Sequence, residues 1–290
     1  MLKNQIKKVI IVGGTHGNEF TGVYLAKYWL QNPKFIKRDA FETSVVFANK
    51  KAFKDVRRYV DRDLNRSCSH SILLKEPVLH EEKLAHKLNS IIGKKGDNEN
   101  NADFVIDLHT TTSNMGISLV ISNENELTWM AASFLKKEFP SLNIYRWQGD
   151  EEGAFVDSLG SDGFAIEVGA IPQGLLRADI YMQTRDVVYR LLDFLQSPVI
   201  VDRSVEIYDH VKLVDYPREA DGELKAMVHP DRQDMDFKAI KKDDPLFLTF
   251  DGETIVYDGD ETLYGLFINE AAYYEKGFAL CLARKIEYSY

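Results

Sequence analysis

A histidine and a carboxylate stand three residues apart in the turn that follows the first apolar run of the chain. Residues 9–12 (VIIV) predict a short buried strand, which Gly13 and Gly14 end before His16 and Glu19. The turn lacks the Gly-Lys-Ser/Thr of a P-loop and the Gly-x-Gly-x-x-Gly of a dinucleotide site. Imidazole and carboxylate groups suit zinc, and a catalytic zinc takes three protein ligands and a water. We therefore interpret His16 and Glu19 as two ligands of a zinc site.

The third ligand and a general base are expected at the ends of other strands. Residues 104–109 (FVIDLH) form a second buried apolar run, which reaches His109 and then a polar loop. Residues 163–169 (GFAIEVG) form an apolar strand with a single carboxylate, Glu167. Such a group is costly to bury unless it has a partner or a function. We predict one Zn²⁺ per chain, bound by His16, Glu19 and His109, with Glu167 as the general base.

The most basic stretch of the chain, residues 57–66 (RRYVDRDLNR), indicates an anion site. Asp61 and Asp63 alternate with its arginines, which favours positioned guanidinium groups over a solvated run of charge. A guanidinium binds a carboxylate in bidentate fashion, which a lysine cannot do. In a chain of net charge −9, this stretch predicts local binding of an anionic substrate.

Composition excludes several classes of partner. The net charge of −9 argues against nucleic acid or an anionic membrane as the main partner, and no apolar segment approaches the ~20 residues of a transmembrane helix. Nothing suggests that Cys68 and Cys281 pair, which fits a reducing cytosol. We expect a cytoplasmic enzyme with a small-molecule substrate; whether it forms a homo-oligomer stays open.

The order of predicted elements indicates two domains. Strands (45–48, 117–121) and helices (78–92, 126–139 and one ending at Pro198) alternate up to about residue 200, which predicts an α/β fold with a parallel or mixed sheet and helices on both faces. Beyond residue 201, short alternating runs are separated by Asp-Gly pairs at Asp221, Asp251 and Asp258, each a hairpin signal. We predict a catalytic domain over 1–200 and a smaller all-β domain over 201–290 that narrows the entrance to the site.

Motifs spread almost from end to end resemble the aspartoacylase family, whose relatives include succinylglutamate desuccinylases. They are residues 13–19 (GGTHGNE), 63–66 (DLNR), 107–109 (DLH), 166–169 (IEVG), 172–174 (PQG) and 269–276 (NEAAYYEK). The family hydrolyses N-acyl amino acids on a zinc carboxypeptidase-like fold, so the resemblance implies that fold, zinc and a deacylase activity.

The resemblance also implies roles for residues that spacing alone does not assign. It supports the same three zinc ligands, and Glu167 as the base that activates water and contacts the substrate. Arg58 is implied to polarise the scissile carbonyl and hold the oxyanion. Asn65 and Arg66 are implied to bind the α-carboxylate of the amino acid. Tyr273 is implied to contact the substrate from the β domain.

One departure from the family pattern bears on the substrate. Aspartoacylases proper carry an arginine ten residues before the catalytic glutamate, which grips the side-chain carboxylate of aspartate; this chain has Asp157 there. The surrounding loop adds Asp150, Glu151 and Glu152, with Arg146 as the nearby arginine. The aminoacylase-3 branch has an acidic residue at that position and acts on N-acetyl aromatic amino acids and mercapturates. Residues 22–33 and 61–68 also resemble that branch more, so we expect N-acetyl-aspartate to be a poor substrate.

Two other functions are compatible with the same residues. A peptidase of the same chemistry, or a zinc-containing protein that binds acylated amino acids without turnover, are the alternatives; retention of both Glu167 and Arg58 argues against the second. We assign no function to His70, His210 or His229.

Overall fold

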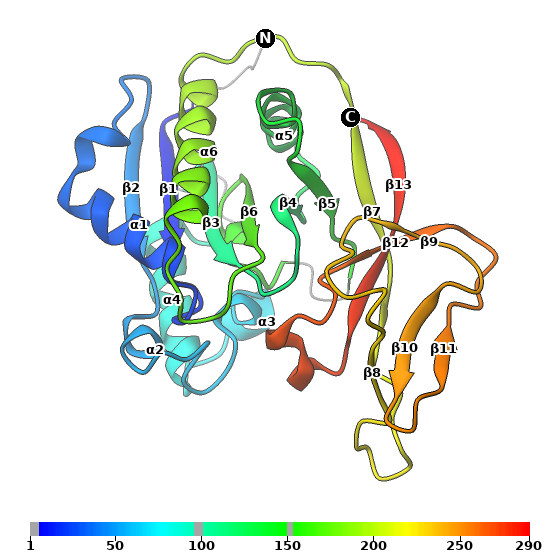
Figure 1. Ribbon diagram of the computed structural model, residues 1–290. Helices are drawn as coiled ribbons and strands as arrows, with labels where there is room; N and C mark the ends of the chain where they lie inside the picture. The colour runs from blue at the N-terminus through cyan, green and yellow to red at the C-terminus, as the bar shows by residue number, and fades with distance from the viewer. Residues whose placement is uncertain (1–5, 96–100, 150–152) are drawn as a thin grey trace.

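Two β-sheets form the frame of the computed structural model, which describes residues 6–95, 101–149 and 153–290 (Figure 1). The larger sheet has ten strands in the order β2-β1-β3-β6-β4-β5-β7-β13-β12-β9. These are Glu42–Phe47 (β2), Lys8–Gly13 (β1), Phe104–Thr110 (β3), Asp162–Gly169 (β6), Gly116–Ile121 (β4), Asn143–Arg146 (β5), Ser204–Val214 (β7), Leu280–Ser289 (β13), Leu263–Leu266 (β12) and Ala239–Ile240 (β9). The smaller sheet, in the order β11-β10-β8, contains Thr254–Val256 (β11), Pro245–Thr249 (β10) and Ala226–Val228 (β8).

The helices cover the first half of the larger sheet. The α-helices are Phe20–Gln31 (α1), Lys50–Lys54 (α2), His70–Leu73 (α3), His80–Ile92 (α4), Glu126–Glu138 (α5) and Ala178–Gln196 (α6). Short 3₁₀ turns span Pro33–Phe35 (η1), Leu64–Arg66 (η2), Asp157–Leu159 (η3) and Ala271–Lys276 (η4). No helix in the described part of the chain is both long and apolar enough to cross a membrane.

Alternation of side chains in β1 explains why helices lie on both faces of the sheet. Val9 and Ile11 belong to the core that includes residues of α1, α5 and α6. Ile10 and Val12 point the other way, into a second core with Leu88 of α4. Strands β1, β2, β3 and β6 are parallel, whereas β4 is antiparallel to β6. The predicted mixed α/β sheet is confirmed.

The C-terminal part is rich in β-structure, as predicted, but it extends the same large sheet. β7 pairs in parallel with β5 and antiparallel with β13. The turns at Asp221 and Asp251 form between paired residues, as expected. The hairpin predicted at Asp258 is wrong, because β11 before it lies in the small sheet and β12 after it lies in the large one. In Figure 1 the small sheet lies on the side of the molecule away from α1 and β2.

The parallel strands bring the predicted site residues to one edge of the sheet. His16 and Glu19 follow the end of β1, His109 is the penultimate residue of β3, and Glu167 lies near the end of β6. β3 lies between β1 and β6, and His109 is the register partner of Glu167. Ligands of open α/β sheets bind at this carboxyl edge.

Candidate active site

His16 and Glu19 are placed by a tight connection between β1 and α1. The backbone at Gly13 passes so close to α1 that a Cβ there would come within 2.2 Å of the Gly22 carbonyl oxygen, so glycine is required. The chain then turns through His16 into α1, which begins at Phe20. His16 and Glu19 are 2% and 3% exposed, and His16 Nδ1 lies 2.6 Å from Glu19 Oε1.

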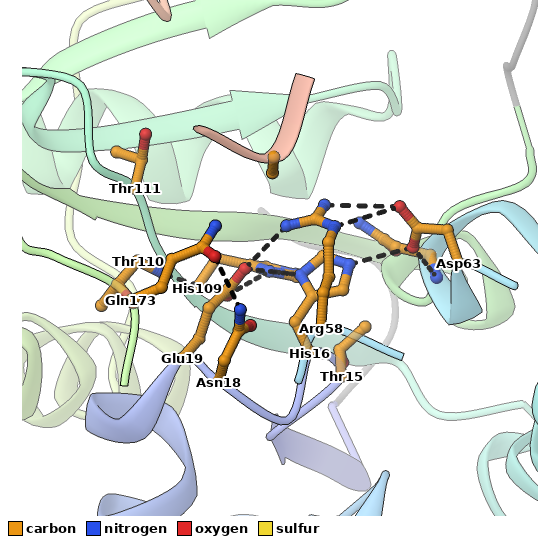
Figure 2. A network of polar contacts seen from close by, with 12 residues as sticks. Thr15, His16, Asn18, Glu19, Arg58, Asp63, His109, Thr110, Thr111 and Gln173 are labelled. Carbon is orange, nitrogen blue, oxygen red and sulfur yellow. Dashed lines mark hydrogen bonds and ion pairs between the residues drawn. The ribbon is translucent and has the colours of Figure 1, made fainter. Parts of the chain in front are cut away.

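His109 completes a cluster of three ligand atoms. Its Nδ1 lies 2.9 Å from Glu19 Oε2 and 3.1 Å from His16 Nδ1 (Figure 2). One ligand atom from each of the three residues lies within 4.8 Å of the other two. Two imidazoles and a carboxylate with an adjacent cavity are the ligand set of a catalytic zinc site. The three residues predicted as ligands are therefore brought together.

Carboxylates on the far sides of the two imidazoles favour a cation in this cluster. His16 Nε2 lies 2.9 Å from Asp63 Oδ1, and His109 Nε2 lies 2.7 Å from Asp107 Oδ2. A proton on each Nε2 satisfies these contacts and leaves both Nδ1 lone pairs directed into the cluster. Three converging electron-pair donors need a positive charge between them, so the residues fit a divalent metal ion.

The shifted pKa values of His109 and Glu19 also indicate that the cluster favours a positive charge. Burial would lower the pKa of His109, but the Asp107 and Glu19 carboxylates raise it well above its usual value. Burial would raise the pKa of Glu19, but the two histidines hold it below its ordinary value. The cluster therefore favours a charged carboxylate together with a proton or another cation.

Arg58 lies beside the cluster and is held by two carboxylates. Its Nη1 lies 3.1 Å from Glu19 Oε1, and its Nη2 lies 3.3 Å from Asp63 Oδ2 (Figure 2). Burial would lower the pKa of Arg58, but Asp63 and Glu19 raise it, so the guanidinium stays charged. Asp63 thus contacts one predicted ligand and this arginine at the same time.

Glu167 faces the same cavity from β6. Its register partner across the parallel pair is His109, which puts the two side chains on one face of the sheet. Burial raises the pKa of Glu167 well above its ordinary value, and the negative charges of Glu19 and Glu270 add to the rise against His109 and Arg58. A carboxyl group with a raised pKa is suited to accept a proton and then return it.

Asn65 and Arg66 are presented by η2, which Asp63 caps by accepting a hydrogen bond from the Asn65 backbone N–H at 2.9 Å. The Asn65 side-chain oxygen accepts from the Val156 N–H at 2.8 Å, which fixes its amide. The Arg66 guanidinium lies over the Phe155 ring, 4.7 Å from its centroid. Both residues line the cavity, with side chains suited to bind a carboxylate.

Tyr273 lines the cavity from η4, in the C-terminal part of the chain, and its contact with substrate stays a prediction. The preceding Glu270 fixes η4 to the loop after His109. Its carboxylate accepts hydrogen bonds from the Thr112 backbone N–H at 2.7 Å and hydroxyl at 2.9 Å, and also from the Thr111 hydroxyl. Segments about 160 residues apart in the sequence are thereby joined at the site.

The cavity has a volume of about 530 Å³ and combines the polar centre with an apolar wall. Besides the residues above, its lining includes Val120, Tyr145, Trp147, Phe155, Asp157, His210, Val211, Leu213, Phe267, Lys276, Phe278 and Cys281. Burial raises the pKa of Asp157 to about 7, with the Asp107 carboxylate adding to the rise. Arg146 is instead paired with Asp209 at 2.7 Å, and residues 150–152 lie outside the described residues.

Sequence reasoning missed several residues that surround the ligands. Asp107 stands two residues before His109 on a strand, so a period of two could have predicted its contact with that imidazole. Tyr145 and Trp147 carried no motif. His210, to which the sequence assigned no function, lines the cavity from β7.

Family models match both parts of the chain. The Succinylglutamate desuccinylase/Aspartoacylase catalytic domain matches residues 5–195. The AstE/AspA barrel-sandwich hybrid domain matches residues 203–285.

Individual proteins match over nearly the whole length. The chain is 42% identical to a "Probable aspartoacylase" of Acaryochloris marina, covering 100% of this chain and 99% of that protein. It is 40% identical to the human N-acyl-aromatic-L-amino acid amidohydrolase (carboxylate-forming), covering 99% and 93%. Among solved structures, murine aminoacylase 3 superposes with a TM-score of 0.93 at 38% identity, covering 99% of this chain and 98% of that one. The relatives are thus named for two different substrates.

Proposed function

The chain belongs to the succinylglutamate desuccinylase/aspartoacylase family, and from this premise we propose that it is a zinc-dependent hydrolase of N-acyl amino acids with aromatic side chains. Its products are a carboxylate and the free amino acid; N-acetyl aromatic amino acids and mercapturates are the substrate class. The observation that supports this proposal most directly is one cavity lined by three convergent ligand atoms, by Glu167 and by aromatic rings.

We assign the metal to His16, Glu19 and His109, supported by their converging donor atoms and by the carboxylates behind both imidazoles. A zinc ion there would supply Lewis acidity, which lowers the pKa of water to ~7 and polarises a carbonyl. Asp63 and Asp107 hold the two imidazoles in the orientation that binding requires.

In this proposal Glu167 moves the proton. It takes a proton from the attacking water and gives it to the amine nitrogen as the amide bond breaks. Its raised pKa supports this role, because it makes the carboxylate a stronger base toward the attacking water. Its position opposite His109 supports contact with the reacting atoms.

Arg58 stabilises the negative charge that grows on the carbonyl oxygen as water adds. It stays charged, and Glu19 and Asp63 hold its guanidinium in place before substrate arrives. A fixed donor of this kind is typically worth ~10²–10³ in kcat. Asn65 and Arg66 bind the α-carboxylate, which sets the distance between that carboxylate and the scissile bond.

The aromatic side-chain preference rests on the wall of the cavity. Trp147, Phe155 and Phe267 line it, which favours a flat apolar group. Asp157 occupies the sequence position at which aspartoacylases proper have an arginine for the side-chain carboxylate of aspartate. The side chain of N-acetyl-aspartate would therefore meet either a negative charge or a protonated carboxyl group.

N-acetyl-aspartate is the second candidate substrate, and Lys276 is the observation that favours it. Lys276 lines the cavity and forms no ion pair with another described residue. Its ammonium group could bind a second carboxylate in place of the missing arginine. The relatives named as aspartoacylases agree with this candidate.

The deciding experiment compares kcat/KM for N-acetyl-tyrosine and N-acetyl-aspartate on zinc-loaded protein. We expect N-acetyl-tyrosine to be preferred by at least about 10-fold, from burial of one aromatic ring. A preference for N-acetyl-aspartate would move the assignment to the second candidate. Zinc binding without turnover of either would favour a binding protein, and cleavage of peptides longer than a dipeptide would favour a peptidase.

We also propose a cytoplasmic location, which the two buried, unpaired cysteines support.

A further inference from the structure

Four aromatic rings contact one another in succession along the cavity wall, starting beside Arg66, which we propose binds the substrate α-carboxylate. The centroid distances are 6.3 Å between Phe155 and Trp147, 4.6 Å between Trp147 and His210, and 6.1 Å between His210 and Tyr145. Arg66 lies over the first of these rings. A substrate whose α-carboxylate is bound at Arg66 would therefore extend its side chain along this wall.

His210 enters the cavity through an irregularity of β7. Ala283 of β13 pairs with His210, and Leu282 pairs with Lys212, so Val211 is an extra residue in the strand. Neighbouring residues of a regular strand point to opposite faces, yet His210 and Val211 both line the cavity. Such bulges re-aim side chains and are frequent next to active sites.

The ring of His210 is fixed with one nitrogen left for a ligand. The Tyr145 hydroxyl lies 2.7 Å from His210 Nδ1. Nε2 makes no hydrogen bond within the described part of the chain, although the ring lines the cavity. Burial lowers the pKa of His210, so the imidazole is neutral at pH 7 and presents either a donor or an acceptor.

The neighbouring Trp147 lines the cavity with its indole ring, and its centroid lies 4.6 Å from that of the His210 ring. Its Nε1 is fully buried, so this atom is closed to a ligand in the cavity, and it has no hydrogen-bond partner among residues 6–95, 101–149 and 153–290. Trp147 therefore offers an apolar ring surface, and Nε2 of His210 is the polar atom with which a substrate hydroxyl group can form a hydrogen bond.

We propose that His210 is a specificity-determining residue that binds a hydroxyl group at the far end of an aromatic substrate side chain. The inference rests on the proposed function and narrows it: phenolic N-acyl amino acids are preferred over phenyl ones. Tyr145 is a positioning residue, since it acts by holding the His210 ring.

The test measures kcat/KM for N-acetyl-tyrosine and N-acetyl-phenylalanine in the wild type, His210→Phe and His210→Gln. Phenylalanine keeps a ring in the wall and removes its hydrogen bond, so we expect kcat/KM for N-acetyl-tyrosine to fall about 10-fold. The value for N-acetyl-phenylalanine should stay within about 2-fold, because that substrate makes no such bond. The loss should appear in KM, and His210→Gln should restore part of the preference.

His229→Phe is the matched control, because His229 lies outside the cavity lining and its Nδ1 accepts from the Asp231 N–H at 3.1 Å. The His229→Phe substitution should change kcat/KM for neither substrate. An equal loss on both substrates in His210→Phe, or an unchanged ratio, would overturn the role of His210. A wild type that prefers N-acetyl-phenylalanine would overturn the inference and leave the proposed function standing. If the wild type hydrolyses only N-acetyl-aspartate, that result would overturn both this inference and the proposed function.

Discussion

Replacing Asp63 with asparagine tests the central claim that one carboxylate organises both the metal ligands and the oxyanion donor. Asp63 Oδ1 lies 2.9 Å from His16 Nε2 and accepts from the Asn65 N–H, while Oδ2 lies 3.3 Å from Arg58 Nη2. The substitution keeps the shape of the side chain. It removes the charge and converts one acceptor oxygen into an NH₂ donor.

The contacts of Asp63 predict whether catalysis or zinc binding is impaired more. The amide oxygen gains two hydrogen bonds by facing His16 and Asn65, so the NH₂ group must face the guanidinium of Arg58, donor against donor. Of its two carboxylate partners among the described residues, Arg58 then keeps Glu19 and loses its fixed position. We expect kcat to fall about 100-fold, near the low end for loss of an oxyanion donor. Zinc affinity should fall about 10-fold, the usual lower bound for a lost partner of a ligating histidine.

The assay measures kcat for N-acetyl-tyrosine and zinc affinity by competition with a chelator. Asp61→Asn is the matched control, because Asp61 lies two residues away and its exposed carboxylate accepts from the His80 N–H at 2.8 Å and from no other described residue. It should leave both quantities within about 2-fold. Unchanged kcat and zinc affinity in Asp63→Asn, or an equal loss in Asp61→Asn, would refute the reasoning.

Three further predictions concern the base, the metal and Asp157. Glu167→Gln should retain stoichiometric zinc while kcat drops at least ~10²-fold, and turnover near the wild-type rate would remove Glu167 from the role of base. His109→Ala should abolish stoichiometric zinc in metal analysis of the purified protein and remove the rise in Tm that zinc gives the wild type; full zinc content would contradict its role as a ligand. Burial raises the pKa of the Asp157 carboxyl group to about 7 in the folded state, compared with ~4 in the unfolded chain. Between these two pH values the unfolded chain releases its proton while the folded state keeps it, so the folded state loses stability as the pH rises from ~4 to 7. Asp157→Asn should therefore raise Tm at pH 8 by ~2 °C or more and give little gain near pH 4; an equal gain at both pH values would contradict the buried, protonated carboxyl group.

The sequence predicted the polar centre because its residues follow strand ends that local patterns reveal. Apolar runs followed by glycine or polar loops located His16 and His109, and the parallel sheet that such runs imply brings them to one edge. The lone carboxylate of Glu167 inside an apolar strand led, by the same logic, to its prediction as the base, and this role remains a prediction. Composition indicated an anion site in residues 57–66, but the individual roles of Arg58, Asn65, Arg66 and Tyr273 came from motif resemblance and remain predictions.

The position of His210 in the cavity wall could not be predicted, because it depends on strand register rather than on a local sequence pattern. The alternation of residues 205–213 predicts a strand, but the extra residue Val211 decides that His210 faces the cavity. The hairpin predicted at Asp258 failed for a related reason: local turn chemistry does not say which sheet the next strand joins. The partners of Glu270 lie about 160 residues earlier, beyond any local signal.

The strand order also constrains how the chain is made on the ribosome. β5 stands at residues 143–146, yet its outer neighbour β7 begins at residue 204 and is itself covered by β13, which ends at residue 289. During synthesis the open hydrogen-bonding edge of β5, and then that of β7, must wait for segments that emerge later, and exposed edges of this kind recruit other strands. The nascent protein therefore stays open to mispairing until β13 has left the exit tunnel. Truncation of the C-terminal strand should trap that state, whatever becomes of the catalytic residues.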